Sequence, residues 1–312
     1  MIRVDLITGF LGAGKTTFIQ KYAAYLLRQG KKAGIVENDY GAVNVDTMLL
    51  QELERDGCII ESVAGACDAD CHRRRFKTKL IALGMSGVDR VLIEPSGVFD
   101  ADEFFDALYE PPLDRWYEIG SVIAIVDAQL EENLSDHSEY LLASQVANAG
   151  AVLLSRAADA SEEDMIRTTD HLNRAMESVG CSRRFGSDVI ACDWDDLTDA
   201  DFARIMDSGY LPESYVKRHE ALDGAYRSLY FLNRSLTAGE AKEKAQRLLN
   251  DPDCGNVFRV KGFVNDGGWM QLNATKKSLS LTPIAQGQEV IIVIGEELNE
   301  ERIRDIVDNK KG

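Results

Sequence analysis

Short apolar runs alternate with longer amphipathic stretches over roughly the first two thirds of the chain. The runs are rich in Val, Ile and Leu, as expected for strands of a parallel sheet that is buried on both faces. The stretches between them repeat apolar residues at helical spacing, and one such stretch, Lys15–Arg28, ends before a glycine. This alternation predicts an α/β fold with a mostly parallel sheet and helices on both faces. The expected strands are 4–7, 33–36, 88–94, 121–126, 151–154 and 188–191, and the expected later helices are 73–84, 100–108, 140–149, 161–179 and a short one ending at 206.

The last part of the chain has a different pattern. Its strands and helices are grouped rather than strictly alternating, which predicts a small α+β domain. We therefore expect two domains, residues 1–215 and 225–312, with the linker 216–224 inside a longer connection at 209–227. The expected strands of the second domain are 228–235, 256–264, 269–273 and 288–294, and its expected helices are 238–249 and 299–307.

A glycine-rich loop follows the first apolar run. Four of its residues fill the G-x-x-x-x-G-K-[ST] pattern of a phosphate-binding loop. Glycines let successive backbone N–H groups turn towards phosphates, and the following helix adds the positive end of its dipole. Lys15 is expected to reach the outer phosphates and Thr16 to hold Mg²⁺; the alternative is a plain strand-to-helix turn. The residues expected around the nucleotide are Gly9, Gly12, Ala13, Gly14, Lys15, Thr16 and Thr17.

Composition narrows the choice of partners. The 312-residue chain is 45% apolar and carries a formal net charge of −17. That balance argues against nucleic acid or an anionic membrane as the main partner, because both attract basic surfaces. No apolar run reaches the roughly 20 residues of a membrane span, and the first strand begins so early that we expect no signal peptide. We therefore expect a cytoplasmic protein whose six cysteines are reduced.

Two acidic segments follow strands that should end near the phosphate loop. Glu94 closes an apolar strand, and an acidic residue at that place holds Mg²⁺ or its water in phosphate-loop proteins. Gly97 would allow a close backbone approach to the terminal phosphate. Glu37 and Asp39 follow an earlier strand and are candidates for contact with a cation. Ordinary solvated turns are the alternative for both segments.

A cysteine pair marks a candidate metal site. Cys67 and Cys71 lie four residues apart, which places both thiols on one face of a helix. Two aspartates and His72 crowd the same segment, and thiolate, imidazole and carboxylate together suit Zn²⁺ or a similar borderline metal. A single C-x-x-x-C pair indicates metal less strongly than two C-x-x-C pairs. Buried or redox-active cysteines therefore stay open as the alternative.

Taken together, these motifs resemble the CobW-type GTPase family, phosphate-loop proteins associated with metal handling. Residues 9–17 resemble that family's loop throughout, 37–41 resemble its Glu-Asn-Glu-Phe-Gly switch segment, and 94–97 match its Glu-x-x-Gly element. Residues 258–263 and 293–295 resemble its C-terminal domain, so the similarity covers nearly the whole chain. It implies a P-loop NTPase domain with a CobW-like C-terminal domain, GTP or GDP with Mg²⁺ as cofactors, and a bound transition metal.

The cysteine segment departs from the family pattern. Members usually carry Cys-x-Cys-Cys, whose thiols are implicated in binding Zn²⁺, Co²⁺ or another transition metal, whereas this chain has Cys67-Asp68-Ala69-Asp70-Cys71. One thiol is missing and the spacing is longer. The resemblance adds Glu37 as a candidate ligand beside Cys67 and Cys71, because the first acidic residue of the switch can join the thiols. A harder site with Asp disfavours a soft all-thiolate metal, and loss of metal binding is the alternative.

The base-reading segment departs as well. The family's Asn-Lys-x-Asp pairs its Asp with guanine, but this chain has Ser155-Arg156-Ala157-Ala158, with Asp159 one position late. Without that carboxylate, charge-assisted hydrogen bonds of ~1.5–3 kcal/mol each are lost. Asp159 could still serve in a loop one residue longer, and Arg156 could lay its guanidinium against the base. GTP is expected ahead of ATP, with relaxed base specificity as the alternative.

The first functional hypothesis is a nucleotide-dependent metal chaperone or metal-insertion accessory with slow GTP hydrolysis. Lys15 and the loop amides would neutralise phosphate charge, and Thr16 would bind Mg²⁺ with Asp39 or Glu94. Hydrolysis should be slow because nothing in the sequence resembles an arginine finger. The expected partner is a client metalloprotein, and a homodimer is among the options for assembly.

Two rivals come from other functional classes. A nucleotide-binding switch without metal would remodel a metalloenzyme or corrinoid-enzyme client, and the altered cysteine and base segments favour it. A small-molecule kinase shares the loop, but no acceptor-site base stands out and the 94–97 element speaks against it. The metal content of protein purified without chelator separates the first hypothesis from the first rival.

Overall fold

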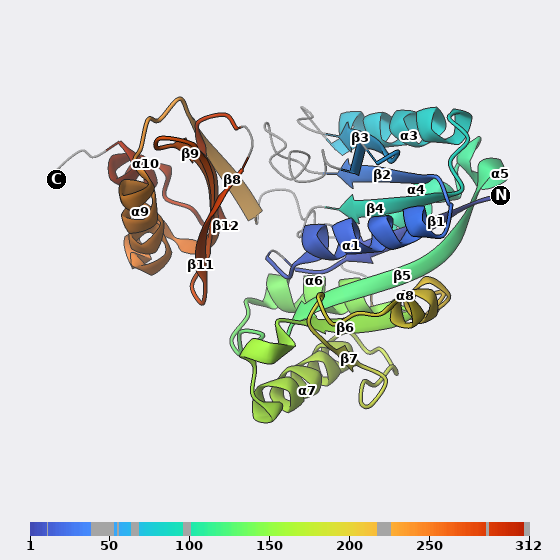
Figure 1. Ribbon diagram of the computed structural model, residues 1–312. Helices are drawn as coiled ribbons and strands as arrows, with labels where there is room; N and C mark the ends of the chain where they lie inside the picture. Colours follow the sequence, from blue (N-terminus) through green and yellow to red (C-terminus); the bar gives the residue numbers. More distant parts are fainter. Residues whose placement is uncertain are drawn as a thin grey trace. The chain divides into compact units, whose positions relative to one another are not determined.

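The computed structural model of the chain describes residues 1–10, 12–38, 53–54, 56–63, 69–95, 101–216, 226–284 and 287–308. It divides into two compact units, Met1–Arg218 and His219–Gly312 (Figure 1). Three residues that the sequence offers as ligands or phosphate contacts, Asp39, Cys67 and Gly97, lie outside the described residues, as does the side chain of His72.

The first unit contains, within its described residues, a seven-stranded parallel sheet (Figure 1). Its strands follow the spatial order β3-β2-β4-β1-β5-β6-β7, and each neighbouring pair is parallel. β1 lies in the middle, so that β4 borders it on one side and β5 on the other. The strands are β1 (Ile2–Thr8), β2 (Ala33–Asn38), β3 (Ile59–Val63), β4 (Arg90–Pro95), β5 (Tyr117–Asp127), β6 (Ala151–Ser155) and β7 (Ile190–Ala191).

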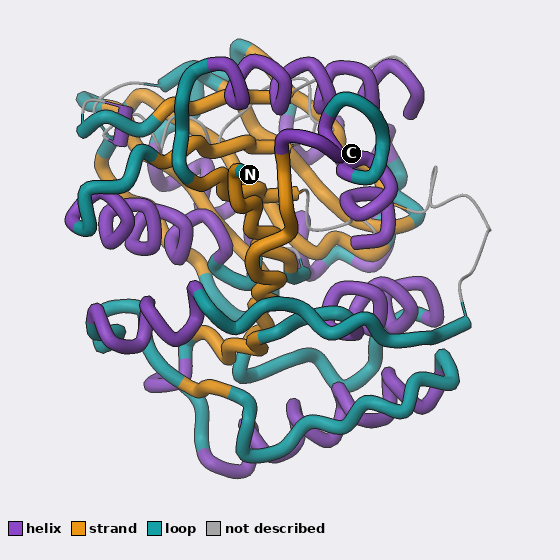
Figure 2. Tube along the Cα trace, turned by 90° about the vertical axis from the view of Figure 1, so that its right-hand side faces the viewer, coloured by secondary structure: helices purple, strands orange, loops and turns teal. Residues whose placement is uncertain are grey.

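Helices cover both faces of this sheet, as Figure 2 shows along the sides of the strands. On one face, α1 (Lys15–Arg28) and α8 (Asp199–Met206) form one core, in which the rings of Tyr22 and Phe202 stack with centroids 6.0 Å apart. The opposite face has the larger core, to which several further helices of the described residues contribute. These are α3 (Ala69–Met85), α4 (Ala101–Leu108), α5 (Leu113–Trp116), α6 (Asp136–Ala147) and α7 (Glu162–Ser178).

Alternation along β1 explains why a short apolar run becomes a strand in this position. Val4 and Leu6 enter one core, and Ile7 enters the other, because successive side chains of a strand point to opposite faces. A strand with helices on both faces therefore needs apolar residues at nearly every position. This pattern confirms the α/β fold class predicted from the sequence.

The second unit contains a five-stranded antiparallel sheet in the order β11-β10-β9-β12-β8. Two helices cover one face of it, α9 (Ala238–Asn250) and α10 (Glu300–Val307), and share a single apolar core with it. The small α+β architecture predicted for this part of the chain is confirmed. The strands are β8 (Tyr226–Leu232), β9 (Asn256–Asn265), β10 (Trp269–Thr275), β11 (Leu279–Pro283) and β12 (Val290–Glu296).

The structure differs from the sequence expectation in a few elements. β3 and β11 are strands that the apolar pattern does not predict, and β5 begins earlier than expected, at Tyr117. The expected connection at 209–227 contains the boundary between the two units, and its described first part belongs to the first unit. There the backbone of Gly209 accepts a hydrogen bond from Val122, and Val216 donates one to Val179, so this part packs on the first unit. Within the described ranges, no helix has the length and apolar content needed to cross a bilayer.

Candidate nucleotide and metal site

The phosphate loop lies where the strand order of the parallel sheet reverses. It leaves the carboxyl end of β1, between the ends of β4 and β5. In open parallel sheets, ligands bind outside the carboxyl ends of the strands at such a reversal point. The topology alone therefore assigns the ligand site to this edge of the first unit.

Two glycines give the loop its path. Gly9 has a φ of 140°, and a Cβ there would lie 2.1 Å from the Ile125 carbonyl oxygen of β5. Gly14, with φ 95° and ψ 20°, is the residue from which α1 begins. A side chain at Gly9 would meet both a strained backbone and a fixed carbonyl, so the turn requires glycine there.

The Lys15 side chain folds back over the loop and is buried. Its Nζ donates to the carbonyl oxygen of Gly9 at 2.9 Å and to that of Phe10 at 3.4 Å. The ammonium group thus lies beside the N-terminus of α1, where the first-turn N–H groups and the helix dipole also favour negative charge. The two features together make an anion site suited to the phosphates of a nucleotide.

Three oxygen-bearing side chains meet beside this anion site. Thr16 Oγ1 donates to Glu94 Oε1 at 2.7 Å, which joins the first turn of α1 to the end of β4. Glu37 on β2 is the cross-strand neighbour of Glu94, and both carboxylates are buried. Two buried carboxylates on adjacent strands repel each other unless a cation or proton offsets their charge. Hydroxyl and carboxylate oxygens are the ligands that Mg²⁺ prefers, so this donor set fits that ion.

The residues expected near the base lie at and just after the carboxyl end of β6. Arg156, in the left-handed conformation with φ 54°, donates from Nη1 to the Gly12 carbonyl oxygen at 3.0 Å. Its other terminal nitrogen pairs with the Asp127 carboxylate, which also accepts from the Gln129 backbone N–H at 2.9 Å. Arg156 therefore supports the phosphate loop from behind, and Asp127 orients it.

The other two residues of that segment lie differently. Ser155 is buried, and its hydroxyl donates to the Val126 carbonyl oxygen at 3.3 Å. Asp159 ends the 3₁₀ turn η1 (Ala157–Asp159), and its side chain is exposed while its carbonyl oxygen accepts from Gln129 Nε2 at 2.7 Å. The structure thus brings Arg156 and Ser155 to the loop and leaves the Asp159 carboxylate facing solvent.

Sequence reasoning did not identify Trp194 as part of this site. Its indole Nε1 donates to the Gly14 carbonyl oxygen at 3.3 Å, and its ring meets that of Phe18 edge-on, with centroids 5.4 Å apart. The available signal was a large aromatic residue inside an otherwise acidic, turn-rich segment just after the last strand of the sheet.

A buried polar network lies farther down β1, away from the loop. Asp5 accepts from Arg90 Nη2 at 2.8 Å, from the Tyr22 hydroxyl at 2.7 Å and from the Ser121 backbone N–H at 2.8 Å. Burial, and then the Asp5 charge, raise the pKa of Tyr22 well above its usual range. The network ties α1 to three strands and keeps the helix in place below the phosphate loop. Asp5 and Arg90 are charged residues within apolar strands, which is the signal that could have revealed them.

Cys71 lies in the first turn of α3 and is half-buried. Since α3 follows β3, that turn lies at the carboxyl edge of the sheet, the edge to which Glu37 also belongs. Among the residues that the structure describes, no three His, Cys, Asp or Glu side chains group closely enough to hold a metal ion. The remaining described cysteines are Cys58, Cys181, Cys192 and Cys254.

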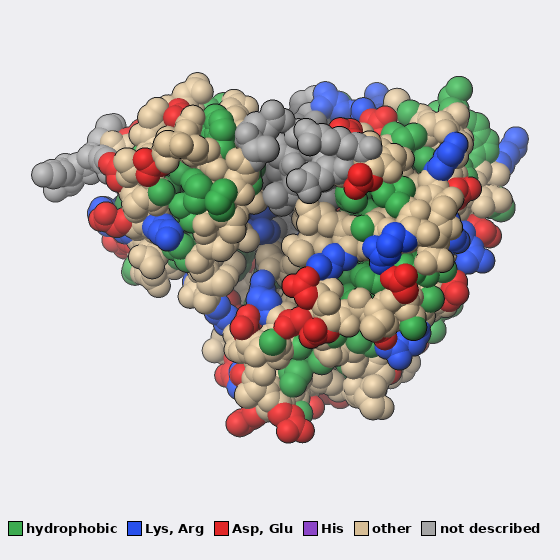
Figure 3. All heavy atoms as spheres, in the orientation of Figure 1, with side chains coloured by type: hydrophobic (Ala, Val, Ile, Leu, Met, Phe, Trp, Pro, Cys, Tyr) green, Lys and Arg blue, Asp and Glu red, His purple; other side chains and the backbone are tan. Residues whose placement is uncertain are grey.

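The helix that carries Cys71 is basic within an acidic protein. Figure 3 shows basic side chains along the edge of the first unit over α3, and acidic ones gathered near α7. Glu110 pairs with two of the basic residues, and the hydrogen bond from Lys77 is the main reason why the pKa of Glu110 is lowered. Positive charge therefore flanks the cysteine segment, supplied by Arg73, Arg74, Arg75, Lys77 and Lys79.

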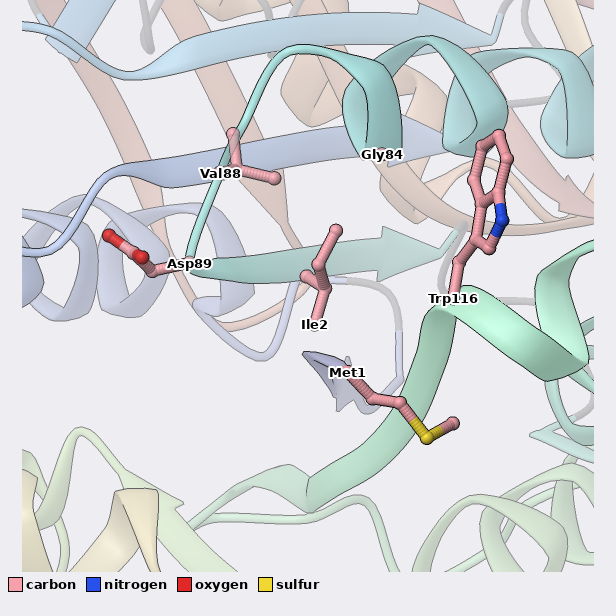
Figure 4. A pocket seen from close by; sticks show the side chains of 6 residues that line it. All are labelled: Met1, Ile2, Gly84, Val88, Asp89 and Trp116. Carbon is pink, nitrogen blue, oxygen red and sulfur yellow. The ribbon is translucent and has the colours of Figure 1, made fainter.

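A separate cavity of about 440 Å³ opens at the opposite edge of the sheet (Figure 4). It lies where β1 and β4 begin, whereas the phosphate loop lies where these strands end. It is therefore not part of the nucleotide site. Its lining residues are Met1, Ile2, Gly84, Val88, Asp89 and Trp116.

Known proteins resemble the part of the chain that forms this site. The family described as CobW/HypB/UreG, nucleotide-binding domain, matches residues 3–180, more than half of the chain. The zinc chaperone YeiR of Escherichia coli K12 is 29% identical over 178 residues, which cover 57% of this chain and 51% of that protein. The zinc chaperone YjiA of the same strain is 29% identical over 175 residues, covering 53% and 52%. The chain thus spans about half the length of the curated relatives it matches.

A crystal structure of the Zn(II)-bound YjiA GTPase from E. coli aligns with 100% of this chain and 99% of that one, at 21% identity and a TM-score of 0.39. The match to the family confirms, at family level, the resemblance to CobW-type proteins that was stated from the sequence. The chain belongs to the CobW/HypB/UreG family, and its residues 3–180 match the nucleotide-binding domain of that family.

Proposed function

We propose that this chain is a nucleotide-dependent metal chaperone that binds and slowly hydrolyses GTP. The observation that carries the proposal is the hydrogen bond from Thr16 to Glu94, beside the cross-strand pair of Glu94 and Glu37. It joins the phosphate loop directly to β4, and the neighbouring strand β2 leads into the predicted switch segment at 37–41. A change at the phosphates can therefore reach a candidate metal ligand through a single strand-to-strand contact.

On this proposal, the chain's own residues bind and orient the nucleotide. Lys15 and the loop N–H groups would hold the outer phosphates, and Thr16 with Glu94 would hold Mg²⁺, together with Asp39. Bound Mg²⁺ would neutralise phosphate charge. Gly97 would let the backbone approach the terminal phosphate. Because no arginine is placed by sequence motif as a catalytic finger, we expect intrinsic hydrolysis below about 10⁻² s⁻¹.

The cargo of the proposed chaperone is a transition metal. Glu37, Cys67 and Cys71 are the proposed ligands, with His72 as a further one, and a thiolate–carboxylate set suits Zn²⁺ or Co²⁺. The names of the relatives YeiR and YjiA as zinc chaperones support Zn²⁺ as the first ion to test. The recipient would be a client metalloprotein.

The base preference follows from the segment at 155–159. Arg156 supports the loop and is not placed to read a base edge with the nitrogens that already bind Gly12 and Asp127. Reading guanine therefore depends on Asp159, whose carboxylate is exposed. We propose GTP as the nucleotide, and expect Asp159→Asn to weaken GDP binding while leaving ADP binding unchanged. Equal affinity of the wild type for GDP and ADP would instead establish relaxed base specificity.

The central test is a Zn²⁺ titration of the full chain in three states: nucleotide-free, with GDP, and with a non-hydrolysable GTP analogue. Competition with a chromophoric chelator gives the affinity in each state. We expect the GTP-analogue form to differ from the GDP form, and Cys71→Ser to lower the affinity about 10-fold or more. Cys254→Ser, at a buried thiol of the second unit, is the matched control. Equal Zn²⁺ affinity in all three states contradicts the coupling.

A second candidate function is a nucleotide-binding switch that carries no metal and remodels a metalloenzyme or corrinoid-enzyme client. The cysteine segment favours it, because Cys67-Asp68-Ala69-Asp70-Cys71 has one thiol fewer than the family pattern. Elemental analysis of protein purified without chelator separates the two functions. Nucleotide binding with less than a tenth of an equivalent of metal, and no Zn²⁺ retained in the titration, would support the switch.

A further inference from the structure

The segment that follows β7 contacts one side of α1 along its whole length. We call residues 194–199 the strap. Trp194 Nε1 donates to the Gly14 carbonyl oxygen at 3.3 Å, Lys21 pairs with Asp195 at 2.5 Å, and Arg28 pairs with Asp199 at 2.6 Å. The three contacts on α1 are seven residues apart, about two helical turns, so they lie on the same side of the helix.

The three contacts of the strap differ in how far they are exposed to solvent. Asp195 is 92% exposed, and Arg28 and Asp199 are each more than half exposed, so solvent screens both ion pairs. Trp194 is half-buried and packs edge-on against Phe18, which is fully buried in the core beneath α1. The indole is therefore the contact of the strap that is least exposed to solvent, and it lies at the phosphate-loop end of α1.

Trp194 reaches the residue at which the loop becomes a helix. The Gly14 carbonyl oxygen accepts the Phe18 N–H at 3.1 Å, as in the first turn of the helix, and also accepts the indole N–H. A Cβ on Gly14 would lie 3.2 Å from the indole nitrogen and 3.8 Å from Ser155 Cβ, so the indole and β6 enclose this peptide group. The orientation of Gly14 fixes the direction of the N–H groups that follow it.

We propose that Trp194 is a positioning residue for the phosphate loop. By holding the Gly14 carbonyl, the indole would keep the N–H groups at the start of α1 directed at the phosphates, and the strap would connect the loop to α8. The proposal rests on the nucleotide site proposed above. Its ligand is the diphosphate part of a nucleotide, whatever the base. The alternative is that Trp194 only fills space beside Phe18.

The experiment uses the full chain and measures GDP affinity by calorimetry in the presence of Mg²⁺. Trp194→Phe keeps a ring beside Phe18 but removes the N–H, and we expect it to raise the Kd for GDP about 3- to 10-fold, as for the loss of one hydrogen bond. The melting temperature of the nucleotide-free variant should fall no further than that of Trp116→Phe, a matched change at the opposite edge of the sheet. An unchanged Kd for Trp194→Phe overturns the proposal.

A second measurement does not depend on how the Trp194 variant folds. The chain has three tryptophans, so Trp116→Phe with Trp269→Phe leaves Trp194 as the only tryptophan, whose emission is followed with excitation beyond the absorption of tyrosine. We expect its fluorescence to change on addition of GDP and Mg²⁺, with a midpoint equal to the Kd from calorimetry. No change in emission while GDP binds would overturn the positioning role. Failure of the wild type to bind GDP at all would instead refute the proposed function.

Discussion

Replacing Asp5 by Asn tests how the first unit holds α1 below the phosphate loop. The Asp5 carboxylate is buried and accepts hydrogen bonds from Arg90 Nε at 2.5 Å and Nη2 at 2.8 Å, as well as from Tyr22 and Ser121. Asn keeps the size of the side chain but removes its charge. The Arg90 side chain, 3% exposed, would then be a buried cation without its counter-charge.

The expected loss of stability follows from that burial. Removing one partner of a buried ion pair costs about 3–5 kcal/mol, whereas a whole domain is stable by about 5–15 kcal/mol. Asp5→Asn should therefore remove roughly a fifth or more of the unfolding free energy of the first unit. Asp5→Leu combined with Arg90→Met removes both charges, so it should cost less than the sum of the two single changes. Asp199→Asn breaks the half-exposed pair with Arg28 and should cost about 1 kcal/mol or less.

Urea unfolding followed by far-ultraviolet circular dichroism gives these free energies, provided that the transition of the first unit is resolved from that of the second. The comparison between Asp5→Asn and Asp199→Asn is the decisive one, since each removes one carboxylate charge from an ion pair. A loss for Asp5→Asn no larger than for Asp199→Asn would refute the reasoning. Strict additivity of the two changes in the double variant would refute it as well.

Three further predictions concern the loop, a helix terminus and the cysteines. Gly9→Ala should raise the Kd for GDP at least 10-fold, measured by calorimetry, because its Cβ would lie 2.1 Å from the Ile125 carbonyl oxygen. The control Gly186→Ala has open space around its Cβ and should leave this Kd unchanged. The backbone N–H of Ser161, then its hydroxyl and an arginine, lower the pKa of Asp164 to about 2. Since its unfolded pKa is about 3.9, the melting-temperature loss of Asp164→Ala should be full near neutral pH and should shrink as the pH falls below about 4. Burial, then nearby acids, raise the pKa of the Cys58, Cys192 and Cys254 thiols to about 11. Mass spectrometry should therefore find that iodoacetamide alkylates these thiols slowly at pH 7.5 and faster as the pH rises towards that pKa. Rapid labelling of the native protein at pH 7.5 would contradict this prediction.

The sequence was sufficient where a structural feature is local. The loop at 9–17 and helix α1 follow from a few neighbouring residues, and strands such as β4 and β6 are apolar runs buried on both faces. β3 escaped because its residues are mostly part-exposed and show neither alternation nor a long apolar run. β11 does alternate, but only from Leu279 to Thr282 before a proline, and its residues are part-exposed or exposed. Position at the edge of a sheet, and not local propensity, makes them strands.

Contacts between distant residues were not readable from the sequence. Trp194 reaches Gly14 across 180 positions, and Arg90 reaches Asp5 across 85. No local pattern predicts such pairs, because they depend on the order in which the strands lie side by side. Thr16 and Glu94 are 78 positions apart, yet the motif analysis assigned both to the same Mg²⁺ site, since each stands at a known place in phosphate-loop proteins.

The position of Glu94 provides a physical link between the proposed Mg²⁺ site and a proposed ligand of the cargo metal. Its carboxylate binds Thr16 on one side and neighbours Glu37 on the other, so a cation held by Thr16 and Glu94 lowers the repulsion that Glu37 experiences. If Glu37 binds the cargo metal, the nucleotide state changes the charge around a cargo ligand without any large movement. Coupling free energies are reciprocal, so Zn²⁺ must then change the affinity for the GTP analogue by the same factor by which the analogue changes the affinity for Zn²⁺. Glu37→Gln should remove both effects together, whereas loss of only one of them would mean that the two sites communicate by another route.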